Sequence, residues 1–172
     1  MSIYQNIARR FIAGFIDILV FIPLSLIYDL ILNYTENKVL IFVLTIISSF
    51  ITLGYSVWLH SNYGQTIGKA LMKIKVMDID EKKLPSLKQA FLRESIYIII
   101  GILGLLKLTY DILFSEEEFL KLIDNYSDFG TDILLYWLIL ELVSMFTNKK
   151  HRAIHDFIAN TVVLKGGVPL DL

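Results

Sequence analysis

The sequence predicts an all-α membrane protein with four transmembrane helices and both termini in the cytoplasm. The chain of 172 residues is 55% hydrophobic and 19% charged, with a mean hydropathy of +0.61, whereas a soluble domain is about 45–50% apolar and about 25% charged. The apolar residues are gathered into four runs, most of which reach the roughly 20 residues needed to cross a bilayer. The basic residues lie mainly on one side of those runs.

The four predicted spans are residues 11–32, 39–59, 95–114 and 131–147 of a single domain. The first apolar run is too long for a signal peptide and no small-residue cleavage site follows it, so we expect a retained helix. Lys107 and Asp111 interrupt the third span, but at i, i+4 they can pair on one helix face. We therefore keep that crossing, with a re-entrant helix as the alternative.

The distribution of charge sets the predicted orientation. Two basic residues precede the first span, seven lie in the loop at 60–94 and four follow the fourth span, so 13 of the 16 Lys and Arg residues fall on one side. The other side carries an acidic segment at 115–130, in which Ser115 and Glu118 have the spacing of a capping box for an external helix. The positive-inside rule then places the 60–94 loop and both termini in the cytoplasm.

The cytoplasmic loop is predicted to be ordered. Residues 70–78 end in an apolar and basic alternation typical of a strand, and residues 80–82 offer a turn, so we expect a short β-hairpin at the membrane surface. Pro85 and the apolar spacing from Leu87 predict an amphipathic helix over 86–94 that leads into the third span. The cations of the loop either set the topology and attract anionic lipid, or form a docking site for a protein partner.

Polar residues inside the spans are the first candidates for function, because an ionisable group in hydrocarbon costs at least about 2.5 kcal/mol. Asp17 and Glu141 each lie six residues from the cytoplasmic end of their span, about 9 Å deep at 1.5 Å per residue. We expect them to face each other, with Thr52 and Ser56 of the second span nearby. Such a cluster can hold a proton or a small hard cation. The alternative is a structural role that fixes helix register.

Arg10 and Asp156 form a second predicted pair. Arg10 faces the same side of its helix as Asp17 but lies about 10.5 Å from it along the axis, which is too far for a direct bridge. The apolar run that begins at Phe157 favours an amphipathic C-terminal segment along the cytoplasmic interface, which brings Asp156 to the depth of Arg10. We predict a shielded Arg10–Asp156 contact at hydrogen-bond distance, with Asp17 deeper and separate.

Several other motifs carry little chemistry. The absence of cysteine excludes a disulfide, a Cys nucleophile and a thiolate metal site. The segment from Gly64 to Lys69 has one residue too few between its glycines for a phosphate loop, so we expect a tight turn whose lysine meets a lipid phosphate or a carboxylate. His151 and His155 lack the Glu of a zinc hydrolase motif and are predicted to be surface imidazoles. We expect no enzyme activity, no cofactor, no metal and no nucleic-acid partner.

Three blocks of the sequence together resemble the RDD family of bacterial membrane proteins, named for one Arg and two Asp residues. The blocks are Arg10 to Asp17, Gly64 to Lys69, and His155-Asp156 followed by Thr161 to Val163. The resemblance implies a bacterial plasma membrane location. A departure is the turn at 80–82, where relatives often have Gly. The resemblance implies that the signature residues are Arg10, Asp17, Gly64, Gly68, Lys69, Arg93, His155 and Asp156.

Two functions remain open at this point. The first is a small-cation or proton-coupled transporter that uses Asp17, Glu141, Thr52 and Ser56, similar to the cation/proton exchange proposed for some RDD members, and oligomeric because four helices enclose little volume. The second is a non-catalytic membrane module that binds a partner protein as an accessory, assembly or self-protection factor. In both cases the expected surroundings are the bilayer, anionic lipid at the cytoplasmic face, and another copy or a membrane protein.

Overall fold

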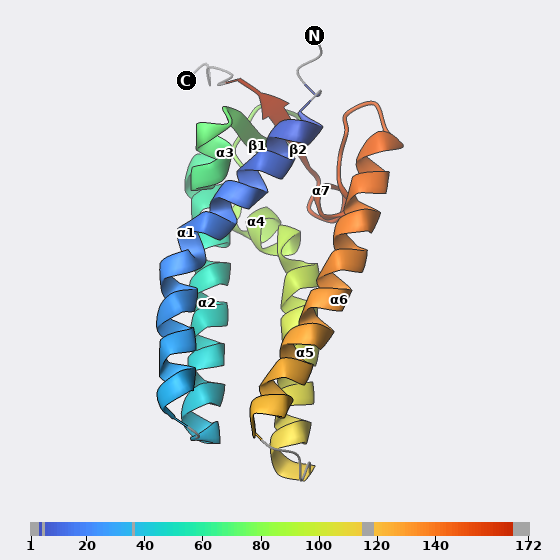
Figure 1. Ribbon diagram of the computed structural model, residues 1–172. Helices are drawn as coiled ribbons and strands as arrows, with labels where there is room; N and C mark the ends of the chain where they lie inside the picture. Colours follow the sequence, from blue (N-terminus) through green and yellow to red (C-terminus); the bar gives the residue numbers. More distant parts are fainter. Residues whose placement is uncertain (1–3, 5, 36, 115–118, 167–172) are drawn as a thin grey trace.

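The computed structural model describes residues 4, 6–35, 37–114 and 119–166, with backbone only for Asp111 and residues 119–131. Its elements follow one another as helices and two short strands (Figure 1). They are α1 (Ile7–Tyr34), α2 (Lys38–Tyr63), α3 (Ile67–Leu71), β1 (Ile74–Asp78), α4 (Leu87–Arg93), α5 (Ser95–Phe114), α6 (Phe119–Phe146), α7 (Ile154–Ile158) and β2 (Thr161–Lys165).

Three of the described helices, α1, α2 and α5, are long and apolar enough to cross a membrane. Their bounds lie close to the first three predicted spans, and α5 is one unbroken helix of 20 residues. The fourth region differs from our expectation, because α6 begins at Phe119 rather than at 131 and takes in most of the predicted external segment. Ser115 and Glu118 of the predicted capping box lie outside the described residues. α6 packs along α5, and its crossing of the membrane remains a prediction.

Local capping signals fix the ends of several helices. α2 begins where the Asn37 side chain accepts hydrogen bonds from the backbone N–H groups of Val39 and Leu40, at 3.1 Å each. It ends at Gly64, whose φ of 68° is in the left-handed region that favours glycine. α4 begins with a capping box between Ser86 and Gln89, which confirms the helix predicted over 86–94.

The strand predicted near residue 74 is present, but the predicted β-hairpin is wrong. β1 pairs in antiparallel register with β2 from the C-terminal segment, so Val76 lies opposite Val163. The turn after β1 does form, with Glu81 at a φ of 64°, yet the chain then enters α4 instead of returning as a strand. The pairing buries both faces of the sheet: Ile74, Val76 and Val163 pack with Ala13 of α1, and Met77, Val162 and Leu164 pack with Tyr4 and Leu84.

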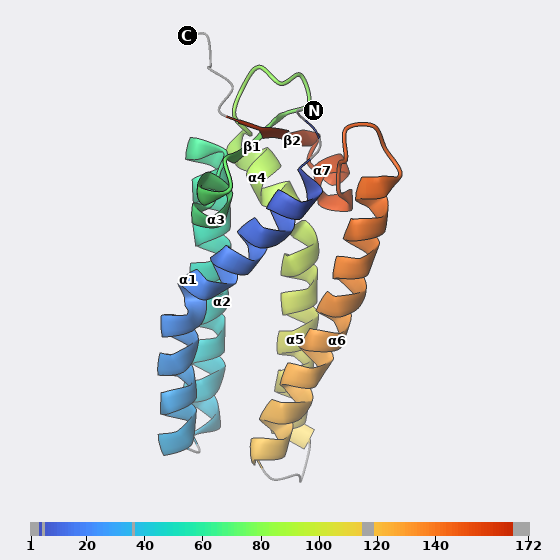
Figure 2. The ribbon, with the colours of Figure 1, turned by 45° about the horizontal axis from the view of Figure 1, so that its top comes forward.

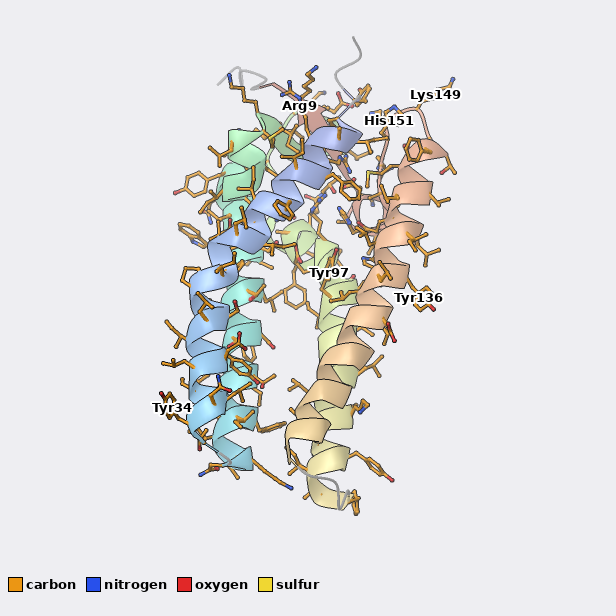
Figure 3. The ribbon with its side chains drawn as sticks, in the orientation of Figure 1. Arg9, Tyr34, Tyr97, Tyr136, Lys149 and His151 are labelled. Atoms are coloured by element: carbon orange, nitrogen blue, oxygen red, sulfur yellow. The ribbon has the colours of Figure 1, made fainter. Side chains whose placement is uncertain are left out.

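The sheet and the short helices gather at one end of the molecule. Figures 1 and 2 show α3, α7 and both strands beside the first turns of α1, while the α1–α2 and α5–α6 pairs extend away from them. Arg9, Lys149 and His151 lie at this end and Tyr34 lies at the opposite one (Figure 3). We call this end, made of α3, β1, α4, α7 and β2, the cap.

Candidate functional site

A buried carboxylate joins the two ends of the chain inside the cap. The Asp156 Oδ2 atom accepts a hydrogen bond from Arg10 Nη1 of α1 at 2.6 Å, and its Oδ1 accepts from Arg93 Nη1 of α4. Asp156 also accepts from the backbone N–H of Ala153 at 3.0 Å, which caps the first turn of α7. The predicted Arg10–Asp156 contact is confirmed, and Arg93 is a second cation on the same carboxylate.

The charge state of Asp156 follows from its neighbours. Burial raises the pKa of this carboxyl, but the guanidinium groups of Arg10 and Arg93 outweigh burial and hold the pKa well below its usual range. Asp156 is therefore an anion shared by two guanidinium groups. The start of α1 is tied to the same place, because Asn6 accepts from Arg10 Nε at 2.8 Å and donates to the Val163 carbonyl of β2 at 2.6 Å.

His155 connects this cluster to Glu141 of α6. Arg93 Nη2 lies 2.9 Å from His155 Nε2, and a guanidinium can only donate, so Nε2 accepts and the imidazole is neutral. The remaining proton is then on Nδ1, which donates to the buried carboxylate of Glu141. The prediction that His155 is a surface imidazole is wrong. His151 points elsewhere, with Nδ1 2.8 Å from the Met145 carbonyl oxygen.

Asp17 accepts three hydrogen bonds at the junction of α1, α2 and α3. The donors are the Tyr55 hydroxyl at 2.8 Å, the Thr66 hydroxyl at 2.6 Å and the Gly68 backbone N–H at 2.8 Å. Gly68 is required here, because a Cβ at this position would lie 2.1 Å from the Ala13 carbonyl oxygen. The Gly64 to Lys69 block is thus a turn followed by a short helix that rests on α1. Asp17 is separate from the Arg10–Asp156 pair, as predicted.

A third group of side chains forms a hydrogen-bonded chain from α3 to the end of α4. Lys69 Nζ lies 2.8 Å from His60 Nε2, His60 Nδ1 lies 3.2 Å from Ser56 Oγ, and Ser56 donates to Glu94 Oε1 at 2.5 Å. The ammonium of Lys69 can only donate, so His60 accepts at Nε2 and donates from Nδ1 to Ser56. Each group therefore donates to the next, and we call these four residues the relay chain.

The environment of Lys69 brings its pKa close to the physiological pH range. Burial and the Arg93 guanidinium lower the pKa of Lys69 to about 8, although the carboxylates of Glu94 and Asp17 oppose the shift. The predicted contact of Lys69 with a lipid phosphate or a carboxylate is replaced by the imidazole of His60. An amine with such a pKa gains and loses its proton near neutral pH, unlike an exposed lysine.

Comparison with known protein families identifies the family of this chain. The RDD family profile matches residues 4–160, nearly the whole chain. The chain belongs to the RDD family. Neither the curated proteins nor the solved structures contain a match. In this RDD protein Arg10 and Arg93 contact Asp156, Gly68 donates to Asp17, and Lys69 begins the relay chain.

No hydrogen bond among the described residues joins the four members of the ion site predicted around Asp17 to one another. Among the described residues no hydrogen bond joins Asp17 to Glu141, which has His155 as its partner instead. Thr52 is exposed and donates to the Ser48 carbonyl of its own helix. Of the four, only Ser56 lies in the relay chain. The depth estimate did not specify neighbours: α1 packs on α3, whereas α6 packs on α5 and α7.

Sequence reasoning missed several residues of the polar groups, Asn6 among them. Tyr55, His60 and Glu94 were not singled out, although Ser56 and His60 stand at i, i+4 on one face of α2 and Glu94 stands at the entrance to the third span. That spacing was the available signal. Within the described part of the chain, no three His, Asp or Glu residues are grouped as metal ligands.

Proposed function

We propose that this RDD membrane protein is a proton-coupled carrier of small cations and that the relay chain holds the coupled proton. The observation that carries the proposal is the unbroken series of hydrogen bonds from Lys69 through His60 and Ser56 to Glu94. It links a base whose pKa is about 8 to a carboxylate. Groups that titrate close to the working pH are the ones that exchange protons efficiently.

A proton can pass along the relay chain without any group moving far. Lys69 gives a proton to His60 Nε2, His60 gives its Nδ1 proton to Ser56, and Ser56 gives its hydroxyl proton to Glu94. The result is a neutral amine at one end and a protonated carboxyl at the other, with the hydrogen bonds reversed in sense. Because the same carboxylate can hold either a proton or a cation, exchange of one for the other is the natural coupling chemistry.

The proposal includes four spans, with the cap and both termini on the cytoplasmic side of a plasma membrane. Two features support it. The basic residues follow the positive-inside pattern, and the loop from 60 to 94 and the C-terminal segment lie together in the cap (Figure 1). The relay chain then lies at the cytoplasmic end of the bundle, where α2 meets α3 and α4.

Reconstitution into proteoliposomes with a trapped pH dye tests the proposal. We expect sodium or potassium gradients to drive proton movement in the wild type. His60→Gln breaks the relay chain and should lower the rate by at least about a hundredfold, the low end of what a proton-transferring side chain contributes. Thr52→Val is the matched control on the same helix and should leave the rate unchanged. Absence of cation-driven proton movement in the wild type, or equal rates in both variants, would sink the idea.

A second candidate function is a membrane module that binds a partner protein. The observation that favours it is the wide exposed apolar surface of α1, α2 and α5. In the most apolar 18-residue stretch of each helix, only 6–12% of the residues are buried inside the protein. Such a surface can be covered either by lipid or by another membrane protein. Photo-crosslinking from Phe50 of α2 and Leu106 of α5, both exposed, distinguishes the two: one specific adduct in native membranes supports a partner, and recovery of uncrosslinked protein alone counts against it.

A further inference from the structure

α4 exposes an apolar face at the edge of the cap. Leu87 and Phe91, one helical turn apart, are 66% and 49% exposed, whereas Ala90 is fully buried on the opposite face. The outer face forms a shallow apolar groove lined by Leu87, Lys88, Phe91 and Leu92. An amphipathic helix of this kind needs an apolar environment on one side only, as is typical of the boundary between membrane and water.

The position of α4 along the chain sets its depth. α4 ends at Arg93 and the apolar helix α5 begins at Ser95, so the groove lies within about 12 Å of the start of a span, taking 1.5 Å per residue. The neighbouring helix α2, which packs against α4, exposes Trp58 and Tyr63 near its end with their rings edge to face. Amphipathic aromatic residues are enriched at this level of a bilayer, beside the lipid headgroups.

The charge beside the groove favours one occupant. Lys88 is exposed and lines the groove with three apolar side chains. An apolar groove with a cation at its edge complements an acyl chain joined to a phosphate. We propose that the α4 groove binds one anionic phospholipid, with the headgroup phosphate on Lys88 and an acyl chain along Leu87 and Phe91. This inference does not depend on the proposed transport.

Lipid in the groove acts on the buried cluster through the other face of α4. Arg93 is at the end of the same helix and donates to Asp156 and to Thr161 of β2, the latter at 2.6 Å. A lipid that holds α4 in place therefore also holds α7 and the sheet. We expect phosphatidylglycerol to raise the melting temperature of the purified protein, and phosphatidylcholine to raise it less.

Native mass spectrometry with added phosphatidylglycerol tests the site. Lys88→Gln should lower the affinity for the tightest bound lipid about fivefold, which is the contribution of one lysine near a membrane surface. Lys83→Gln, another exposed lysine in the same loop, is the matched control and should change binding little. Equal loss in the two variants, or equal affinity of the wild type for phosphatidylcholine, would overturn the proposal.

Two further arms separate this lipid from other occupants. Inorganic phosphate should not displace phosphatidylglycerol, because it lacks the acyl chain; displacement would show a free anion site instead. Since the chain has no cysteine, Leu87→Cys provides a single thiol in the groove. Disulfide-linked dimers of this variant in native membranes would show that a second copy occupies the groove and would refute lipid binding there.

Discussion

Replacing Asp156 with Asn removes one charge from the buried cluster and keeps the shape of the side chain. The Asp156 side chain is 0% exposed, and those of Arg10 and Arg93 are 8% and 3% exposed, so water screens the cluster little. Loss of one partner from a buried ion pair costs about 3–5 kcal/mol, because the other charge is left uncompensated. We expect a loss of this size from Asp156→Asn, and a smaller loss from Arg10→Ala, which leaves the carboxylate paired with Arg93.

Thermal unfolding in detergent, followed by fluorescence of the two tryptophans, measures this loss. At about 2–4 °C per kcal/mol for a chain of this length, Asp156→Asn should lower the melting temperature by roughly 6–20 °C. Asp80→Asn, at an exposed position, is the control and should change it by about 2 °C or less. The variant with both Arg10→Ala and Asp156→Asn should lose less than the sum of the single losses. Strict additivity, or similar values for Asp156→Asn and Asp80→Asn, would refute the reasoning.

Three further predictions concern helix packing and pH. Gly68→Ala should push α3 off α1, because its Cβ would lie 2.1 Å from the Ala13 carbonyl oxygen, and should cost at least about 1–3 kcal/mol; Gly14→Ala meets nothing within 4 Å, and equal melting temperatures for the two variants would contradict the argument. The folded-state pKa of Asp156 is depressed, so its stabilisation is complete above the unfolded value of about 3.9 and is lost as the pH falls through the folded value. A melting temperature of Asp156→Asn that falls in acid as steeply as that of the wild type would contradict this assignment. The folded-state pKa of Lys69 is also depressed, to about 8 from 10.5, but Lys69 is a base: between these values the unfolded chain binds more protons, so stability should rise with pH across that window, and Lys69→Gln should flatten the rise.

The sequence predicted those features that depend on local patterns or on one matching pair of charges. Apolar runs predicted α1, α2 and α5 with bounds close to those observed, and Pro85 with the apolar spacing from Leu87 predicted α4. The Arg10–Asp156 contact was predictable because a buried guanidinium near the interface needs a carboxylate and the C-terminal segment offered one at the right depth. Arg93 was named as a site residue only through the family resemblance, because the positive-inside rule explains a basic residue at the edge of a span equally well.

The predictions that the structure does not bear out concern features that depend on long-range packing. β1 was assigned to a hairpin because the nearest turn was local, whereas its partner β2 lies at the far end of the chain and is selected by burial of both sheet faces. Asp17 and Glu141 were paired by depth alone, and depth does not specify which helices are neighbours. His155 was expected at the surface because its sequence neighbours are basic, yet α7 turns it toward Glu141. One of those basic neighbours, Arg152, instead stacks on the Phe157 ring, with its guanidinium carbon 4.1 Å from the ring centroid.

Titration of Lys69 in the folded protein tests the relay chain most directly. Lysine labelled with ¹⁵N at Nζ gives one resonance per side chain, and Lys69→Arg identifies the relevant signal. We predict that this signal titrates with a midpoint of about 8 and that His60→Gln, which removes the imidazole next to the amine, shifts the midpoint. A Lys69 midpoint near 10.5, the ordinary value for an exposed lysine, would contradict a proton held in the relay chain near neutral pH.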